Sequence, residues 1–207
     1  AYGEKVRIIE TTNPPMFHIN KQKAIEAAKG EWILQLDADE FVSEELKEEI
    51  QRVILGTPTS RRRTPGSSKR DSGQARMTTE YSVAYWISRK NFFLGRFLTK
   101  GGVYPDRTIR LYKNGVARFP CKSVHENVEI EGKVGYLKSD LLHYADPNFS
   151  RYLKRWKRYN LLDTQLLIEE GKRPGFFNYF IVKPIVTFFL MYGRHKGFMD
   201  GWQGLVF

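Results

Sequence analysis

The stretch WILQLDADEF, residues 32–41, constrains this chain more than any other. Its first half is apolar, and its second half carries three acids within four positions, Asp37, Asp39 and Glu40. An apolar run of this length is typical of a covered strand. Because carboxylates crowded at the end of such a strand repel one another, water, a lysine or a bound metal ion must offset the repulsion.

The spacing of the two aspartates suits a ligand site. In an extended chain Asp37 and Asp39 flank Ala38 and share a face. Ligands of α/β sheets bind beyond the carboxyl ends of the strands, where one carboxylate can hold a divalent cation. The other can take a second metal position or a ribose hydroxyl. A solvated strand end is the alternative, because paired aspartates near a turn are common.

The segments around this stretch predict an α/β protein. Residues 6–10 read as a short buried strand, residues 20–29 as a helix, and residues 43–54 as a helix capped by Ser43. The alternation of strand and helix favours a parallel sheet. Further along, strands are expected at 81–93 and 108–115, a hairpin or two short strands at 128–137, and a helix from Ser150 onward.

Composition and charge narrow the choice of partners. The chain has 207 residues, a formal net charge of +11 and one cysteine, Cys121, which fits a reducing compartment. The first ten residues contain no apolar signal segment. The positive charge favours anionic partners such as nucleic acid, acidic lipid or phosphorylated substrates.

Residues 56–76 interrupt the pattern with basic, Gly, Ser, Thr and Pro residues and little to bury. We expect a flexible basic surface insertion. Contact with nucleic acid or an anionic membrane through Arg61–Arg63 is the alternative.

The C-terminal part differs from the rest. Basic and aromatic residues alternate over 151–159, and a very apolar run follows around Lys183 and Pro184. The lysine and the proline disfavour a transmembrane helix and favour one that lies in the membrane interface. The alternative is a helix buried against another part of the protein or a second subunit.

Several separated motifs occur in one order: KQKAIEAAKGEWILQLDADEF, RKNFFLGRF, GGVYPDRTIRLYKN, VHENVEIEGKVGYL, LLHY and GFMDGWQGL. In this order they resemble the inverting family 2 glycosyltransferases with a GT-A fold, and in particular the bacterial subgroup with lipopolysaccharide core glucosyltransferases. The resemblance implies a Rossmann-like mixed sheet flanked by helices over 1–149, without the family's N-terminal strand. Residues 150–207 would form a C-terminal helical extension.

The resemblance also assigns roles around the acidic strand end. Asp39 would be a metal ligand for Mn²⁺ or Mg²⁺, and Asp37 would contact the metal or the ribose. Lys21 would face the nucleotide's diphosphate, or be an exposed helix lysine. Glu40 would be an accessory site residue, or compensate the charge of a helix N-terminus.

The motif YPDRTIRLY supplies the chemistry. By resemblance Asp106 is the general base for the acceptor hydroxyl, with a turn aspartate as the alternative. Arg110 would hold the leaving phosphate or form a strand-end salt bridge. Gly101 and Gly102 would let the backbone approach the donor sugar, or simply make a turn.

Two histidine motifs remain. His125 fits a third metal ligand and Glu126 an acceptor contact. His143 is expected to be a packed histidine with a satisfied hydrogen bond.

The function implied is inverting transfer of a sugar from a nucleotide-diphosphate donor to a glycan or lipid-linked acceptor. The corresponding location is cytoplasmic, peripheral on the inner face of the cytoplasmic membrane. Two alternatives stay open: a nucleotidyltransferase, and a basic module that binds RNA or an anionic membrane.

Overall fold

Strands and helices alternate along the chain. A computed structural model describes residues 6–12, 18–56, 82–120, 127–172 and 175–207. The helices are α1 (His18–Ala27), α2 (Glu44–Ile54), α3 (Phe149–Glu169), η1 (Asn178–Val182), α4 (Lys183–Phe188), η2 (Phe189–Arg194), η3 (Gly197–Asp200) and α5 (Trp202–Val206). The strands are β1 (Trp32–Leu34), β2 (Glu40–Val42), β3 (Ala84–Phe93), β4 (Arg96–Phe97), β5 (Asp106–Lys113), β6 (Ala117–Arg118), β7 (Glu129–Ile130) and β8 (Val134–Asp146).

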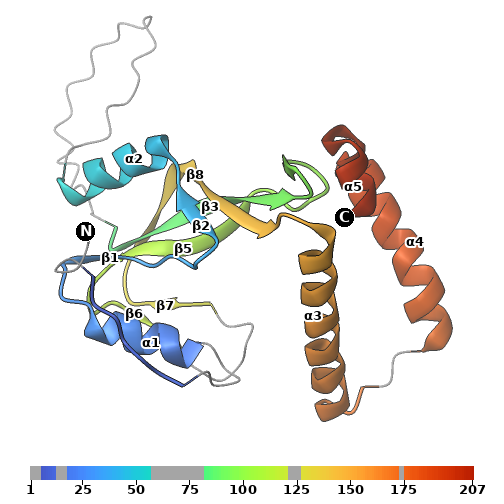
Figure 1. Cartoon of the computed structure of the whole chain (residues 1–207), viewed down its shortest axis with the longest axis horizontal. Coiled ribbons are helices and arrows are strands. Elements are labelled where there is room, and N and C mark those ends of the chain that lie inside the picture. Colours follow the sequence, from blue (N-terminus) through green and yellow to red (C-terminus); the bar gives the residue numbers. More distant parts are fainter. Residues whose placement is uncertain (1–5, 13–17, 57–81, 121–126, 173–174) are drawn as a thin grey trace, which may run out of the picture. The chain divides into compact units, whose positions relative to one another are not determined.

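Six of the described strands form one sheet with the order β1-β5-β3-β8-β2, in which β4 pairs with β3 (Figure 1). The short strands β6 and β7 form a second sheet. The pairs β1–β5, β2–β8 and β3–β4 are antiparallel. The mixed α/β class is therefore confirmed, whereas the purely parallel sheet suggested by the alternation of elements is wrong.

The chain divides into two compact units, and the division falls within β3, β5 and β8. The first unit comprises residues 1–35, 44–87 and 109–137, and the second comprises 36–43, 88–108 and 138–207. The domain boundary expected between residues 149 and 150 stays a prediction.

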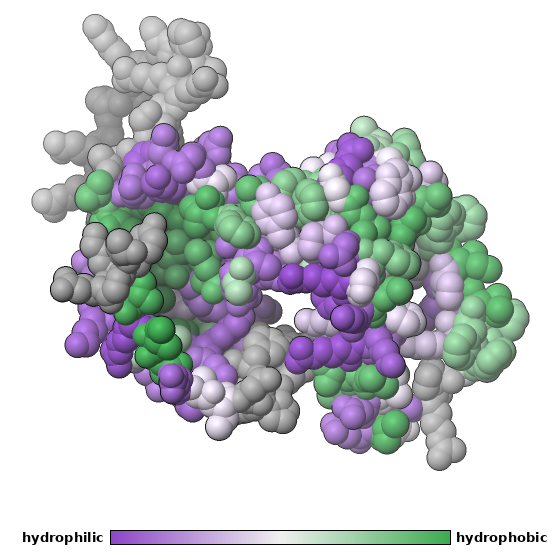
Figure 2. Space-filling view, viewed as in Figure 1, coloured by the Kyte–Doolittle hydropathy of each residue, from purple (hydrophilic) through white to green (hydrophobic). Residues whose placement is uncertain are grey.

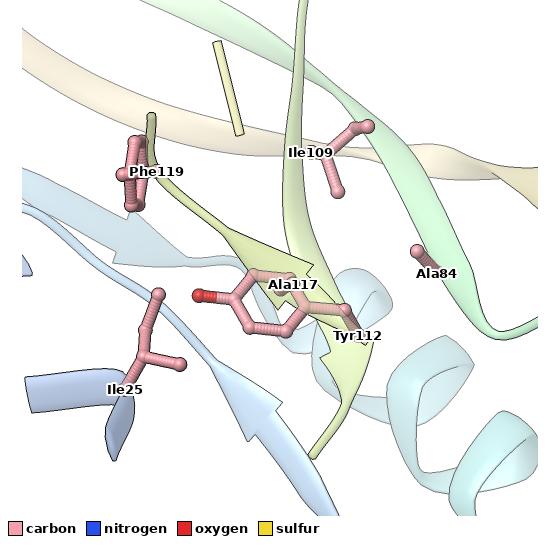
Figure 3. Close-up of a cluster of buried hydrophobic side chains, with 6 residues drawn as sticks. All are labelled: Ile25, Ala84, Ile109, Tyr112, Ala117 and Phe119. Atoms are coloured by element: carbon pink, nitrogen blue, oxygen red, sulfur yellow. The ribbon is translucent and has the colours of Figure 1, made fainter. Parts of the chain in front are cut away.

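The first unit has an apolar core around one side of α1. Its buried members are Ile25, Ala84, Ile109, Tyr112, Ala117 and Phe119 (Figure 3). The Tyr112 hydroxyl donates to Gln35 Oε1 at 3.1 Å, so the ring is buried while its polar end stays bonded.

Aromatic rings fill the second unit. Phe92 lies 5.1 Å from Phe97 and 5.0 Å from Tyr144, measured between ring centroids. Phe93 packs edge-on against Tyr152 of α3 and Phe207 at 5.1 and 5.2 Å. The Phe93 contacts attach α3 and Phe207 to β3.

Most predicted elements are confirmed, with small shifts at their ends. The predicted helices match α1, α2 and α3, and the predicted strands match β3 and β5. The short strand β7 and the long strand β8, which runs on to Asp146, flank Gly132; β7 pairs with β6, and β8 lies between β3 and β2, so the two form no hairpin. Asn148 rather than Ser150 caps α3, and its side chain accepts from the Arg151 N–H.

Two strand predictions are wrong. Residues 6–10 have no strand structure, and Ile8 is 82% exposed. A strand requires a pairing partner, and no strand within the described ranges pairs with this segment. The stretch from Trp32 to Glu40 is not one strand, because a turn at residues 38–39 separates β1 from β2.

The C-terminal apolar run is helical, as predicted. Residues 176–194 form one continuous helical segment through η1, α4 and η2. Within the described part of the chain, no helix is both long enough and apolar enough to cross a bilayer. The basic insertion at 56–76 lies outside the described residues, apart from Gly56.

Candidate active site

A tight turn presents the acidic residues. The Glu40 N–H donates to the Asp37 carbonyl at 3.0 Å, and the Asp37 N–H donates to Glu40 Oε2 at 3.0 Å. The Glu40 side chain is fully buried. Glu40 therefore supports the turn from within, and it lies in β2, four residues before α2 begins. The turn also means that Asp37 and Asp39 are not placed by the alternation of an extended strand.

Asp39 is held by its backbone and engaged by two side chains. Its carbonyl accepts the Tyr144 N–H at 2.8 Å, which ties it to β8. One carboxylate oxygen, Oδ2, accepts from Arg151 Nη2 at 2.7 Å, and the other, Oδ1, lies 3.5 Å from His143 Nε2. The positive charge of Arg151 offsets the charge of Asp39. The Arg151 side chain comes from the first turn of α3 and is half exposed.

The hydrogen-bond chain through Asn91 assigns the tautomer of His143. Asn91 Nδ2 donates to Asp106 Oδ2 at 3.1 Å, because a carboxylate can only accept. The opposite end of the same amide, Oδ1, then faces His143 Nδ1 at 2.6 Å and must accept its proton. A neutral His143 therefore has its lone pair on Nε2, the nitrogen directed at Asp39.

Burial lowers the pKa of His143 below its ordinary value of 6.5, and the nearby Arg89 charge acts in the same direction. The ring is accordingly neutral at pH 7. An imidazole lone pair and a carboxylate then face each other across 3.5 Å. Two ligands of one Mg²⁺ or Mn²⁺ ion at about 2.1 Å each lie roughly 3 Å apart, so this pair fits such an ion with little adjustment.

The pair is short of a complete cage. No set of three or more His, Cys, Asp or Glu side chains in the described ranges could hold a metal ion. The expected third ligand, His125, lies outside those ranges, and so does Glu126. His143 was expected to be only a packed histidine; it has the expected hydrogen bond, and its other nitrogen faces the site.

Asp106, the candidate base, accepts hydrogen bonds from Arg89 and Asn91 through only one of its two carboxylate oxygens. Its Oδ2 accepts from Arg89 Nε at 3.1 Å, from Arg89 Nη2 at 2.7 Å and from Asn91 Nδ2 at 3.1 Å. These side chains leave Oδ1 to other partners, and the Asp106 side chain is 33% exposed. The three donors hold the carboxylate in one orientation.

Arg89 connects the two acidic parts of the site. Besides its contacts with Asp106, its Nη1 lies 3.3 Å from Glu40 Oε1. The guanidinium thus bridges the first residue of β2 and the first residue of β5. Arg89 and Asn91 are two residues apart on β3 and so point to the same face of the sheet. Neither was selected from the sequence, although both belong to the motif RKNFF.

The glycine pair forms a turn that the C-terminal segment supports. Gly101 and Gly102 have φ values of +68° and +76°, a region that strongly favours glycine. The Gly101 N–H donates to the His195 carbonyl at 3.0 Å, and a Cβ at Gly102 would lie 3.3 Å from the His195 ring. The structure thus shows the turn, whereas approach to a sugar stays a prediction.

Asp200 is a residue that the sequence did not single out. Its carboxylate is buried and accepts from the Thr99 and Lys100 N–H groups at 2.9 and 2.7 Å and from the Thr99 hydroxyl at 3.2 Å. The motif GFMDG therefore holds the loop that precedes Gly101. The motif GFMDGWQGL was part of the family resemblance, but no role was assigned to its aspartate.

Two predicted site residues belong to the other unit. Lys21 lies on α1 and Arg110 is buried in β5, where its carbonyl accepts the Gln35 N–H at 2.8 Å. Their predicted contacts with a nucleotide stay predictions, as does that of Asp37, which is half-buried in the turn.

A separate pocket of about 710 Å³ lies in the first unit. It is lined by Gln22, Ile25, Glu26, residues 114–118 and residues 129–131. Three of its lining residues are glutamates and one is an arginine, a composition unsuited to a diphosphate. We therefore place the candidate active site at Asp39, His143 and Asp106 rather than in this pocket.

Comparison with known proteins agrees with the motif order. Residues 1–118, more than half of the chain, match the family described as glycosyl transferase family 2. The chain is 24% identical over 196 residues to the lipopolysaccharide core biosynthesis glycosyltransferase LpsC of Rhizobium meliloti, covering 90% of this chain and 64% of that protein.

Two further relatives are uncharacterized glycosyltransferases of Rickettsia. RT0209 of Rickettsia typhi is 22% identical and the Rickettsia bellii protein 24% identical; each match covers 86% of this chain and 56% of the relative. The chain thus spans less than two thirds of the length of these relatives. No solved structure matches it significantly.

Proposed function

Because the chain belongs to glycosyl transferase family 2, we propose that it moves a sugar from a nucleotide-diphosphate donor to a hydroxyl of a glycan or lipid-linked acceptor. The observation that carries this proposal is the polar chain Asp39–His143–Asn91–Asp106. It connects a potential cation site with a potential base through three consecutive contacts. Asp39 Oδ1 lies 3.5 Å from His143 Nε2, His143 Nδ1 lies 2.6 Å from Asn91 Oδ1, and Asn91 Nδ2 lies 3.1 Å from Asp106 Oδ2.

In this proposal Asp39 and His143 Nε2 would hold a divalent cation. The cation would supply positive charge against the leaving diphosphate, a contribution typically worth several kcal/mol. His125 and Asp37 are candidates to complete the ligand set. The carboxylate and neutral imidazole are ligand types that suit Mn²⁺ or Mg²⁺.

Asp106 acts as the general base. As the acceptor oxygen bonds to the anomeric carbon, its proton passes to Asp106 Oδ1, and the bond between that carbon and the diphosphate oxygen breaks. Attack from the face opposite the leaving group inverts the configuration. Arg89 and Asn91 orient Asp106 by binding its other oxygen.

Arg151 binds Asp39 Oδ2, the oxygen that does not face His143, and we expect this ion pair to open when a cation binds at Oδ1 because the two positive charges repel each other. The side chain is half exposed, so solvent is available to it when the ion pair opens. Its guanidinium would then lie beside the bound diphosphate and could pair with it. Gly101, Gly102, Lys21 and Arg110 are the further candidates for donor contact, and Glu126 for acceptor contact.

A thermal-shift screen of the full-length protein against nucleotide-sugars, with and without Mn²⁺, tests the proposal. We expect stabilisation by a donor only when the metal is present, and loss of that response in Asp39→Ala. Asp163→Ala, which removes an exposed aspartate of α3, is the matched control and should respond like the native protein. Indifference to every nucleotide-sugar would refute sugar transfer.

The same screen separates the alternatives. Stabilisation by free nucleoside triphosphates alone would favour a nucleotidyltransferase. Salt-sensitive RNA binding that survives Asp39→Ala would favour a basic binding module. We also propose that the protein contacts the inner face of the cytoplasmic membrane, where a lipid-linked acceptor would be found.

A further inference from the structure

The helical segment formed by residues 176–194, called here the apolar helix, exposes an unusual amount of hydrocarbon. Four of its five phenylalanines are 60–74% exposed: Phe176, Phe177, Phe180 and Phe189. At roughly 200 Å² per ring, these four alone present on the order of 500 Å² of apolar surface. The largest patch on a soluble monomer is usually about 300–600 Å². Aliphatic residues such as Ile185 (52%) and Val186 (48%) enlarge the patch further.

The surface over α4 in the space-filling view is mostly apolar (Figure 2). All residues of η1 and α4 are exposed, and neither they nor η2 contain a buried residue. An ordinary surface helix packs its apolar side against the protein core, whereas the apolar helix buries no side chain there.

The charged side chains within residues 171–199 are all basic, although Lys172 pairs with Glu170 just before them. Residues 171–199 contain no acid and five Lys or Arg. Lys183, Arg194 and Lys196 are all exposed. The core of a protein–protein interface is depleted of lysine, whereas a helix in the headgroup region of an anionic bilayer is flanked by cations.

The position of Lys183 indicates how the apolar helix would lie relative to a bilayer. It lies near the middle of residues 176–194, so a helix that crossed the bilayer would bury its charge near the centre. Its ammonium lies 5.0 Å from the centroid of the Tyr179 ring, which directs it along the helix surface. Lys183 and Thr187 are one turn apart on α4 and give that side a polar stripe.

We propose that the apolar helix lies in the interface of an anionic phospholipid bilayer, with its phenylalanines among the acyl chains and its cations at the headgroups. This proposal rests on the proposed function, because it names the surface through which the enzyme would reach a lipid-linked acceptor. The proposed partner of the apolar helix is lipid and not a second copy of the chain.

Co-sedimentation of the full-length protein with vesicles tests this inference. We expect binding to vesicles of phosphatidylcholine with phosphatidylglycerol, weaker binding to phosphatidylcholine alone, and loss of the difference at high salt. Lys183→Gln should weaken binding to the anionic vesicles about fivefold and leave binding to neutral vesicles unchanged.

Phe180→Glu with Phe189→Glu should reduce binding to both kinds of vesicle at least tenfold. Leu55→Glu, which alters a residue that is 79% exposed at the end of α2, is the matched control and should bind like the native protein. Circular dichroism establishes that the variants are folded, and Lys183→Gln tests the proposal independently if the double variant is not.

Absence of vesicle binding, or equal binding by the phenylalanine variant, would overturn the inference. So would a dimer, seen by analytical ultracentrifugation, that the phenylalanine variant dissociates while vesicle binding is absent. The metal-dependent response to nucleotide-sugars involves none of these residues. A protein that retains that response but ignores vesicles would refute the membrane inference and leave sugar transfer intact.

Discussion

Replacing Arg89 with methionine removes a side chain that touches both acidic parts of the candidate site. The guanidinium donates to Asp106 Oδ2 through two nitrogens and lies 3.3 Å from Glu40 Oε1. Methionine keeps most of the length and volume of the arginine stem but has no charge and no donor. The variant therefore isolates the polar contacts from the packing of the stem.

The expected loss follows from the burial of the groups left behind. The Glu40 side chain is 0% exposed, so its charge has no access to solvent when Arg89 is gone. Removing one partner of a buried ion pair typically costs about 3–5 kcal/mol. Arg89 and Asp106 are 23% and 33% exposed, and Glu40 keeps the Asp37 N–H, so the lower end applies. We expect a loss of about 3 kcal/mol in the free energy of unfolding.

Urea denaturation near pH 7 measures this loss, and a thermal scan should show the melting temperature falling by roughly 6–12 °C. Arg52→Met is the matched control, since its ion pair with Glu48 is 3.4 Å long and more than half exposed. It should cost less than about 1 kcal/mol.

A double-mutant cycle identifies the cause of the loss. Glu40→Gln removes the stranded charge, so the combination with Arg89→Met should be about 1–2 kcal/mol more stable than the sum of the single effects implies. Two results would contradict the interpretation of Arg89 as the centre of a polar network. One is a loss of less than about 1 kcal/mol in the free energy of unfolding of Arg89→Met, and the other is an unfolding free energy of the double variant that equals the sum of the single effects.

Three further predictions concern the residues bound to this network. Asp106→Asn should lower kcat by about 10²–10⁴-fold with little effect on donor binding, which steady-state kinetics and calorimetry distinguish; an unchanged kcat would exclude Asp106 as the base. Since burial lowers the pKa of His143, the unfolded chain takes up its proton first as the pH falls. The contribution of neutral His143 to the free energy of unfolding is therefore fully present above about pH 6.5. It is lost as the pH falls through the lowered pKa of the folded protein. The midpoint of urea unfolding should change less between pH 7.5 and pH 5.5 in His143→Gln than in the native protein. An equal change in both proteins would contradict a lowered pKa of His143. Asp200→Ala leaves two backbone N–H groups without their acceptor and should cost about 2–4 kcal/mol of unfolding free energy, whereas Asp163→Ala should be nearly neutral.

Elements with strong local signals could be predicted from the sequence. α2 and α3 have apolar residues at helical spacing, and β3 is rich in aromatic and β-branched residues. The acidic residues and their motif order were sufficient to indicate the family, because such motifs are local strings whose order the chain itself records.

Elements that depend on distant partners were not predictable. Residues 6–10 have the composition of a strand but no strand in the described ranges pairs with them. The stretch from Trp32 to Glu40 is divided because β1 pairs with β5 and β2 pairs with β8, and these partners come from well-separated parts of the chain. Local pattern cannot report such a change of partner.

The sequence by itself determined which carboxylates stand at the strand end and to which family the chain belongs. Only the tertiary structure decided what surrounds those carboxylates. Arg151 reaches Asp39 from 112 residues away, and Asp200 holds Thr99 from a distance of 101 residues. The tautomer of His143 depends on Asn91 and Asp106, which lie on different strands. Hydrogen-bond direction and burial are properties of neighbours in space, and no local stretch of sequence contains them.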